Sequence, residues 1–184
     1  MVKKTIEITK ILCVVFIFFF TIVGLLSVGL LTIGWDNALG KFTEMTYNSI
    51  NEPEREEIRK LTMDLTRACS GNNSSCYAKE LYYKTNHIRY KSNSLHQSIH
   101  SPLYTYKNGG DCDNLANMYV EMLKSVGIKS HLSCSTKFRH CVAVVPHISK
   151  DVEYDKKFIV DLANNLYLTI DKNKNEWDIY GKKE

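Results

Sequence analysis

A helical pattern of apolar residues occupies the middle of the chain, directly after the pair Gly109-Gly110. Asp111 is a good N-cap, and Gly127 followed by an apolar residue is typical of a Schellman C-terminus. The pattern therefore predicts a helix whose first turn contains Cys112. Its apolar stripe recurs at steps of three and four residues and consists of Leu115, Ala116, Tyr119, Met122, Leu123 and Val126.

Two further helices are predicted upstream. The first follows a sequence like a capping box at residues 51–54, and the second runs from about residue 77 to residue 89. Residues 92–108 are polar and contain tyrosines, so we expect a long loop there that leads to Cys112 and forms one wall of a substrate site. The two helical stripes are Ile58, Leu61, Leu65 and Ala68, and then Ala78, Leu81, Tyr82, Thr85 and Ile88.

Beyond Gly127 the apolar positions repeat every second residue, which is typical of strands. Residues 128–133 and 139–145 are predicted to pair as an antiparallel hairpin with a turn near Ser135. In the second of these strands His140 shares a face with Val142 and Val144. A polar connection at residues 149–157 then leads to predicted strands at residues 158–162 and 166–170, with a turn at Asn164-Asn165 between them.

Three residues on these predicted elements have the side chains that a nucleophile, a base and an orienting acid require. Cys112 lies at a helix N-terminus, where unpaired N–H groups and the helix dipole favour a thiolate. Asp111 and Asp113 oppose that effect, so the thiolate needs a cationic partner, which His140 would supply. Asp161 is a carboxylate within an apolar strand and would hold the imidazole in the correct tautomer.

The chain has six cysteines, of which Cys13 lies in an apolar N-terminal segment. Four of the others form two pairs that are each close in sequence across a short turn. Local disulfides within these pairs would leave Cys112 as the free thiol, although five cysteines allow several schemes. The predicted disulfides join Cys69 to Cys76 and Cys134 to Cys141.

Residues 11–34 contain no charged side chain, and a helix of that length spans a hydrocarbon core of about 30 Å. Lysines precede this segment, whereas both signs of charge follow it, so the positive-inside rule predicts a cytoplasmic N-terminus. We expect an uncleaved, single-pass signal anchor at residues 1–34, a juxtamembrane stalk at residues 35–52, and a domain at residues 53–184 outside the cell membrane. That compartment also permits disulfides.

The charge of the chain does not indicate a nucleic-acid partner. The formal net charge is only +4, and the lysines are scattered along the sequence. A nucleic-acid-binding domain usually gathers its basic residues into a patch or stripe. Nucleic acid is therefore not expected among the partners.

Three segments together resemble a known family. They are Gly110-Asp-Cys-Asp-Asn-Leu-Ala116, His140-Cys-Val-Ala-Val-Val145 and Phe158-Ile-Val-Asp161, and the upstream segments 76–82 and 86–90 add to the likeness. The chain is similar to the transglutaminase-like (papain-like cysteine) superfamily, specifically its small archaeal and bacterial members, from near residue 76 to near residue 170. It differs from many relatives at Val142 and at Leu162-Ala163.

The resemblance implies an α+β fold in which a central helix bearing Cys112 packs on an antiparallel sheet. By the same resemblance Cys112 is the nucleophile, His140 the general base and acid, and Asp161 its orienting residue. The backbone N–H of Cys112 is the first candidate for the oxyanion donor, and Gln97 is the second. His131 and His147 are alternative candidates for the base.

The expected function is acyl transfer or amide hydrolysis on a protein or peptide substrate, through a thioester and without a cofactor or metal. Two alternatives come from other classes. The first is a non-catalytic module that keeps the fold and binds peptide or cell-wall ligands. The second is a zinc site built from Cys112, Cys134, His140 and Cys141.

Overall fold

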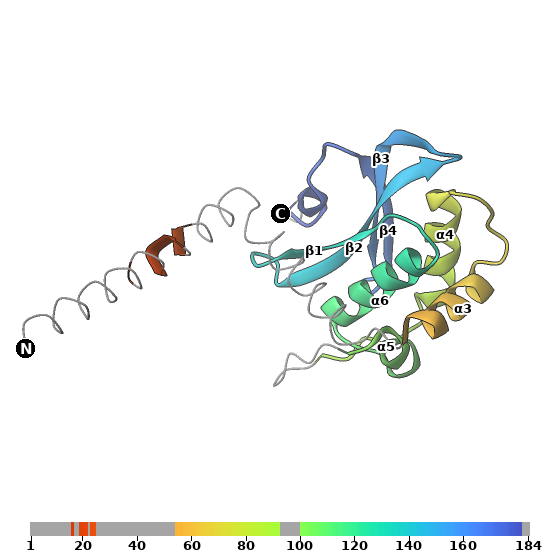
Figure 1. Cartoon of the computed structure of the whole chain (residues 1–184), viewed down its shortest axis with the longest axis horizontal. Helices are drawn as coiled ribbons and strands as arrows, with labels where there is room; N and C mark the ends of the chain where they lie inside the picture. The colour runs from red at the N-terminus through yellow and green to blue at the C-terminus, as the bar shows by residue number, and fades with distance from the viewer. Residues whose placement is uncertain (1–15, 17–18, 22, 25–53, 93–99, 182–184) are drawn as a thin grey trace, which may run out of the picture.

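The computed structural model describes residues 16, 19–21, 23–24, 54–92 and 100–181. Residues 54–92 and 100–181 form an α+β domain with a four-stranded antiparallel sheet in the order β1-β2-β3-β4 (Figure 1). The helices are α3 (Arg55–Leu65), α4 (Ser74–Thr85), α5 (Pro102–Asn108) and α6 (Cys112–Ser125). The strands are β1 (His131–Ser135), β2 (His140–Ser149), β3 (Val152–Asp161) and β4 (Leu166–Asp171), and the short 3-10 helix η2 (Glu176–Ile179) follows them.

Helix α6 has the ends that its sequence predicts. The side chain of Asp111 caps the first turn by accepting a hydrogen bond from the N–H of Asn114 at 3.3 Å. At the other end Gly127 has a φ of 81°, and the N–H of Ile128 donates to the carbonyl of Leu123 at 3.0 Å. These are the conformation and the bond of a Schellman motif, so both predicted ends are confirmed.

The main core lies between the helices and one face of the sheet, because α6 and α4 both pack on β2. The Tyr119 hydroxyl is buried within this core and donates to the carbonyl of Ala78 at 2.5 Å, which joins α6 to α4. The core residues contributed by α6 include Leu115, Met118, Met122 and Leu123, and those contributed by the sheet are Ala143, Val145, Phe158 and Val160.

Replacing Tyr119 with phenylalanine is expected to lower the free energy of unfolding by about 1 kcal/mol, since it removes one buried hydrogen bond and keeps the ring. Thermal unfolding of the variant and the wild type would measure this as a drop of about 3–5 °C in Tm. Tyr154→Phe is the matched control, because Tyr154 is exposed on β3. Equal Tm values for Tyr119→Phe and the control would show that the bond contributes nothing.

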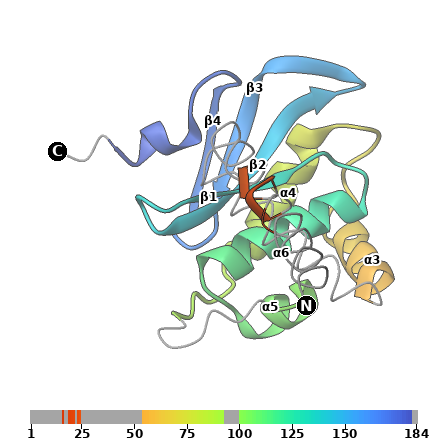
Figure 2. The same ribbon diagram turned by 60° about the vertical axis from the view of Figure 1, so that its left-hand side comes forward.

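The opposite face of the sheet is covered by the C-terminal segment. Val142, Val144 and Ile159 are buried on that face, and Trp177 and Tyr180 pack against them. Figure 2 shows this segment on the side of the sheet away from α3. The sequence predicts that His140, Val142 and Val144 share one face of β2. The packing confirms this for the two valines, since Ala143 and Val145 lie in the core on the other face.

The first two helices differ in their bounds from the prediction. Helix α3 ends at Leu65, so Ala68 lies in the turn that follows, and residue 51 of the proposed capping box lies outside the described residues. Helix α4 begins before residue 77 because the Asn73 side chain accepts a hydrogen bond from the N–H of Cys76 at 3.2 Å. It ends at Thr85, and Ile88 is in a turn beyond it.

The prediction of a loop throughout residues 92–108 was wrong, because residues 102–108 form helix α5. Ser101 caps this helix by accepting from the N–H of Tyr104 at 3.2 Å, and Pro102 occupies the first turn. Serine followed by proline is a helix-start signal, since proline has no N–H to leave unpaired there. The rest of the predicted substrate wall, residues 93–99, lies outside the described residues.

The prediction of a connection at residues 149–157 was also wrong. Strands β2 and β3 continue through this region as a long hairpin, with Lys150 and Asp151 at its tip at φ values of 50° and 65°. The first five residues of β3 are exposed, so no apolar alternation marks them as a strand. Strand β1 starts three residues later than predicted, because Ile128 belongs to the C-terminal motif of α6.

The predicted membrane anchor falls almost entirely outside the described residues. Of residues 11–34 the structure describes only 16, 19–21 and 23–24, all of them helical. Within the described part of the chain, no helix has the length and apolar character that crossing a bilayer requires. The anchor, the stalk and the topology therefore stay predictions.

Candidate active site

Cys112 is the first residue of α6 and is reached through a tightly packed turn. Gly109 has a φ of 80°, and Gly110 pairs with Tyr90 as an isolated parallel bridge. The carbonyl of Gly110 accepts a hydrogen bond from the N–H of Lys91 at 2.8 Å. The strand-like segment at Tyr90 thus holds the turn in place and sets where α6 begins. The thiol of Cys112 is half-buried and is not part of a disulfide.

The two aspartates beside Cys112 do not both carry full charge at neutral pH. Burial raises the pKa of Asp113 to about 7, and a hydrogen bond to Asp111 adds to the increase. Asp113 therefore keeps its proton to a higher pH than an ordinary aspartate and opposes a thiolate less than its sequence position indicates. Burial raises the pKa of the Tyr90 hydroxyl, and the nearby charges of Cys112 and Asp111 raise it further.

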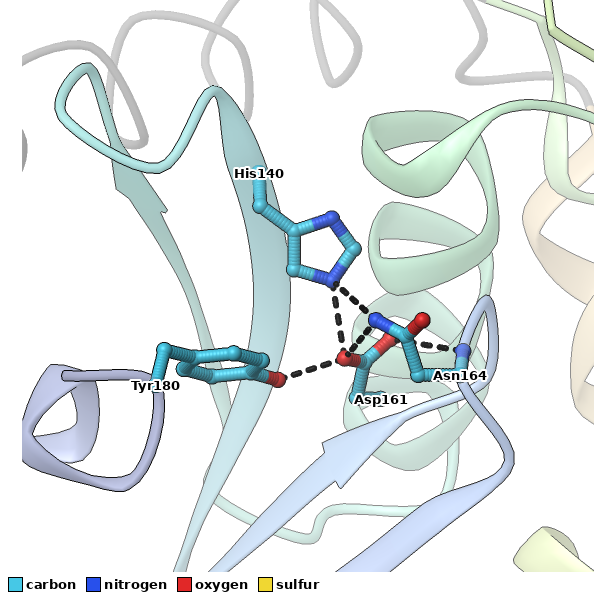
Figure 3. A network of polar contacts seen from close by, with 4 residues as sticks. All are labelled: His140, Asp161, Asn164 and Tyr180. Atoms are coloured by element: carbon cyan, nitrogen blue, oxygen red, sulfur yellow. Dashed lines mark hydrogen bonds and ion pairs between the residues drawn. The ribbon is translucent and has the colours of Figure 1, made fainter. Parts of the chain in front are cut away.

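His140 and Asp161 form the hydrogen bond that the sequence predicts between base and orienting acid. The Nε2 atom of His140 lies 2.8 Å from Oδ2 of Asp161 (Figure 3). The Asp161 side chain is fully buried, and that of His140 is 15% exposed. His140 is the first residue of β2 and Asp161 the last of β3, so the twist and register of the sheet bring them together.

The bond to Asp161 assigns different roles to the two ring nitrogens of His140. A carboxylate only accepts hydrogen bonds, so Nε2 carries the hydrogen and Nδ1 remains available to exchange a proton with another group. The Cys112 side chain lies close enough to His140 to be among the groups that raise its pKa, so we expect it to be that partner. Burial lowers the pKa of His140, but the bonds to Asp161 and Cys112 outweigh it and raise the pKa to about 9.

Two residues that were not expected from the sequence to belong to the site hold Asp161 in place (Figure 3). Asn164 donates from its backbone N–H to Oδ1 at 3.2 Å and from Nδ2 to Oδ2 at 2.7 Å. The Tyr180 hydroxyl donates to Oδ2 at 2.5 Å. Burial raises the pKa of Asp161, but the bonds from His140, Tyr180 and Asn164 outweigh it and lower the pKa, so the group is a carboxylate at neutral pH.

Asn164 had a local sequence signal, whereas Tyr180 had none. The spacing Asp161-x-x-Asn164 suits a side chain that caps a turn by accepting from the N–H three residues on. Tyr180 lies 19 residues from Asp161 and reaches it from the C-terminal segment. Phe138, Trp177 and Tyr180 also form an aromatic cluster, and the Tyr180 ring lies edge-on to the His140 imidazole at 5.7 Å.

The alternative bases lie away from the pair. His131 pairs with Val144 at one end of β1, whereas Ser135 at the other end pairs with His140. Four residues of strand separate these ends by about 13 Å. His147 stacks on Tyr154, and burial followed by the charge of Lys156 lowers its pKa. Gln97 lies outside the described residues, so its oxyanion role stays a prediction.

Both predicted disulfides are present, one between Cys69 and Cys76 and the other between Cys134 and Cys141. The second joins directly paired residues of β1 and β2 and lies next to His140 in sequence. Because it uses both Cys134 and Cys141, these sulfurs are not available as the zinc ligands of the alternative prediction. In the part of the chain that the structure describes, no cluster of three histidine, cysteine or acidic side chains has the arrangement of a metal site.

Comparison with known proteins agrees with this arrangement at the level of the family. No curated protein and no solved structure was found to match the chain. The model of the transglutaminase-like superfamily matches residues 59–160, a region that includes Cys112 and His140 and ends one residue before Asp161. Because this match covers more than half of the 184 residues, the chain belongs to the transglutaminase-like superfamily.

Proposed function

We propose that the protein is a cysteine enzyme that cleaves an amide bond by acyl transfer, with Cys112 as nucleophile, His140 as general base and acid, and Asp161 as the orienting residue. The observation that carries this proposal is the bond between His140 and the buried Asp161 carboxylate, and the nearby Cys112 thiol, which is among the groups that raise the pKa of His140, supports it. A free thiol, a histidine with an assigned tautomer and a charged acid are the parts that thioester chemistry needs.

In the first half of the reaction the proton of the Cys112 thiol already resides on Nδ1 of His140, and the resulting thiolate attacks the carbonyl carbon of a carboxamide. The resulting tetrahedral oxyanion would be stabilised by the backbone N–H of Cys112, which as the first N–H of a helix has no intrahelical partner. His140 then returns the proton to the departing nitrogen, the carbon–nitrogen bond breaks, and a thioester remains on Cys112.

In the second half His140 removes a proton from the acceptor, which attacks the thioester and restores the thiol. Water as acceptor makes the reaction a hydrolysis, and a primary amine makes it a transamidation. Both outcomes use the same three residues, so the proposal covers both. The substrate is a glutamine side chain or a peptide bond of a protein or peptide.

The location we propose is the outer face of a membrane, with the single-pass anchor at residues 1–34 and the stalk at residues 35–52. The two disulfides support an oxidising compartment, since such bonds are rare where thiols are kept reduced. Proteolysis of intact and permeabilised cells tests the location. We expect the domain to be digested in intact cells, and protection there would overturn the location.

The test of the chemistry is the rate at which iodoacetamide alkylates Cys112 as the pH changes, read by mass spectrometry on the full-length chain in detergent. The pKa of His140 is raised to about 9, so the imidazolium is present at neutral pH and is lost as the pH rises through about 9. The lowered pKa of Asp161 keeps its carboxylate charged through the same range. We therefore expect fast alkylation already below about pH 8.

The matched variant is His140→Ala, which removes the cation beside the thiol. Its alkylation is expected to start only near the ordinary thiol pKa of about 8.5, so its rate at about pH 6 should be roughly a hundredfold lower than in the wild type. Cys112→Ala controls for labelling elsewhere and should not be labelled at this position. Identical pH profiles for the wild type and His140→Ala would overturn the nucleophile–base pair and favour a module that only binds its ligand.

A further inference from the structure

We propose that Tyr180 is a positioning residue of this site, because its hydroxyl holds the Asp161 carboxylate in the orientation that aligns His140. The inference rests on the proposed function for its consequence in catalysis. Its physical basis is the 2.5 Å hydrogen bond to Oδ2 of Asp161 and the edge-on contact between the Tyr180 ring and the imidazole (Figure 3).

The C-terminal segment that carries Tyr180 is fixed to the sheet at several points. Glu176 accepts a hydrogen bond from Ser133 of β1 at 2.7 Å and pairs with Lys157 of β3 at 2.8 Å. The indole N–H of Trp177 donates to the same Ser133 hydroxyl at 3.2 Å. The segment is therefore bonded to both β1 and β3 close to Tyr180, which limits the positions that the Tyr180 hydroxyl can occupy.

The Asp161 oxygen atoms are surrounded by donors on different elements. Oδ2 accepts from His140 of β2, from Asn164 of the turn after β3 and from Tyr180 of the C-terminal segment. Oδ1 accepts from the backbone N–H of Asn164. A buried carboxylate with one partner could rotate about its side-chain bonds, whereas donors from three directions leave it one orientation. Nε2 of His140 follows that orientation because it bonds the same oxygen atom.

Tyr180 also moderates the basicity of His140. The titratable groups that act on His140 are Asp161 and Cys112, and Tyr180 acts on it through Asp161. The hydroxyl stabilises the carboxylate independently of the histidine charge, so Asp161 depends less on an imidazolium. Without the Tyr180 hydroxyl, the charged imidazolium supplies a larger share of the stabilisation of the Asp161 carboxylate. The pKa of His140 should therefore rise.

The superfamily match does not include Tyr180, since it ends at residue 160. Tyr180 and Trp177 thus come from a part of the chain outside the matched region, whereas Phe138 lies within it. The Tyr180 ring lies edge-on to the His140 imidazole and is itself packed against Trp177 and Phe138, so it covers the imidazole on that side. A shielded bond is stronger than an exposed one.

The experiment compares the full-length wild type with Tyr180→Phe, which keeps the ring and removes only the hydroxyl. Proton and carbon-13 NMR of chain labelled at histidine measures the pKa of His140, and His140→Ala identifies its resonance among the six histidines. We expect the pKa of His140 in Tyr180→Phe to be higher by about half a pH unit or more. Tyr167→Phe is the matched control, because Tyr167 lies on β4 and packs on the opposite face against Phe158 and Tyr82.

An unchanged or lower pKa of His140 in a folded Tyr180→Phe protein would overturn the inference, as would an equal rise in Tyr167→Phe. Asn164→Ala removes the other side-chain donor and should also raise the pKa. The readout is independent of catalysis, so the two proposals can fail separately. If Cys112 of the wild type does not react with iodoacetamide below about pH 8, the proposed enzyme activity is refuted. The NMR result would still decide the role of Tyr180.

Discussion

Replacing Asp161 with asparagine is expected to lower the rate of amide chemistry by about 10³- to 10⁴-fold while the chain remains folded. The reason is the set of groups around the carboxylate, because every hydrogen bond that reaches it is donated to it. An asparagine amide places its NH₂ group at one of the two oxygen positions. In either orientation that NH₂ group meets at least one donor.

If the NH₂ group of the introduced amide takes the Oδ2 position, His140 can pair with it only by moving its hydrogen from Nε2 to Nδ1. Nδ1 can then no longer accept the Cys112 proton, which removes the base. If the NH₂ group takes the Oδ1 position, it opposes the N–H of Asn164 instead, at a cost of about 1–3 kcal/mol, and the neutral amide no longer supplies the negative charge that stabilises the imidazolium. The measurement is incorporation of a fluorescent amine into casein, together with ammonia release to include hydrolysis.

Asp171→Asn is the matched control for this variant. Asp171 is the last residue of β4 and is exposed. Among the described residues its side chain makes only a surface ion pair, with Lys174, so the same chemical change there should leave the rate unchanged. Thermal unfolding shows whether both variants are folded. Activity of Asp161→Asn within tenfold of the wild type would mean that Asp161 does not orient the base.

The second large effect is expected from Gly109→Ala, which should destabilise the domain by roughly 3–5 kcal/mol. A Cβ atom built on Gly109 lies 2.1 Å from the carbonyl oxygen of Arg89, and the backbone there has a φ of 80°. The obstacle is backbone, so a change of side-chain rotamer does not relieve it. The segment at Arg89 and Tyr90, which is paired with Gly110, would have to separate from the turn.

Gly71→Ala is the matched control, since Gly71 also has a positive φ of 63° but no heavy atom lies within 4 Å of the position that a Cβ atom would take there. It should cost only the strain of the backbone conformation, about 1 kcal/mol. Urea unfolding of both variants measures the difference. Equal losses in the two would show that the close approach at Gly109 is not energetically important, and that φ alone explains the need for glycine.

Gly109→Ala should also affect the reactive thiol in the molecules that remain folded. The turn sets the position of Asp111 and hence the first turn of α6, so a displaced turn moves Cys112 relative to His140. The expected sign is a lower alkylation rate of Cys112 at about pH 6. Gly71→Ala should keep the wild-type rate, since Gly71 precedes α4 and lies in a different turn.

Features that depend on neighbouring residues were predicted well from the sequence. The ends of α6 follow from Asp111 and Gly127, because a cap bonds the backbone within a few residues of itself. The two disulfides join cysteines seven residues apart, so each pair could be recognised from its spacing. Errors occurred where the local pattern was absent, as in the exposed start of β3, or where the Ser101-Pro102 start signal was overlooked.

The sequence by itself determined which residue types are available for chemistry and on which kinds of element Cys112 and His140 lie. Only the tertiary structure decided how they act together, because the deciding contacts join residues far apart in the chain. The pairing of β2 with β3 brings His140 to Asp161, and the C-terminal segment brings Tyr180 to the same carboxylate. Burial, which depends on the whole fold, raises the pKa of Asp113 and so decides how much charge opposes the Cys112 thiolate.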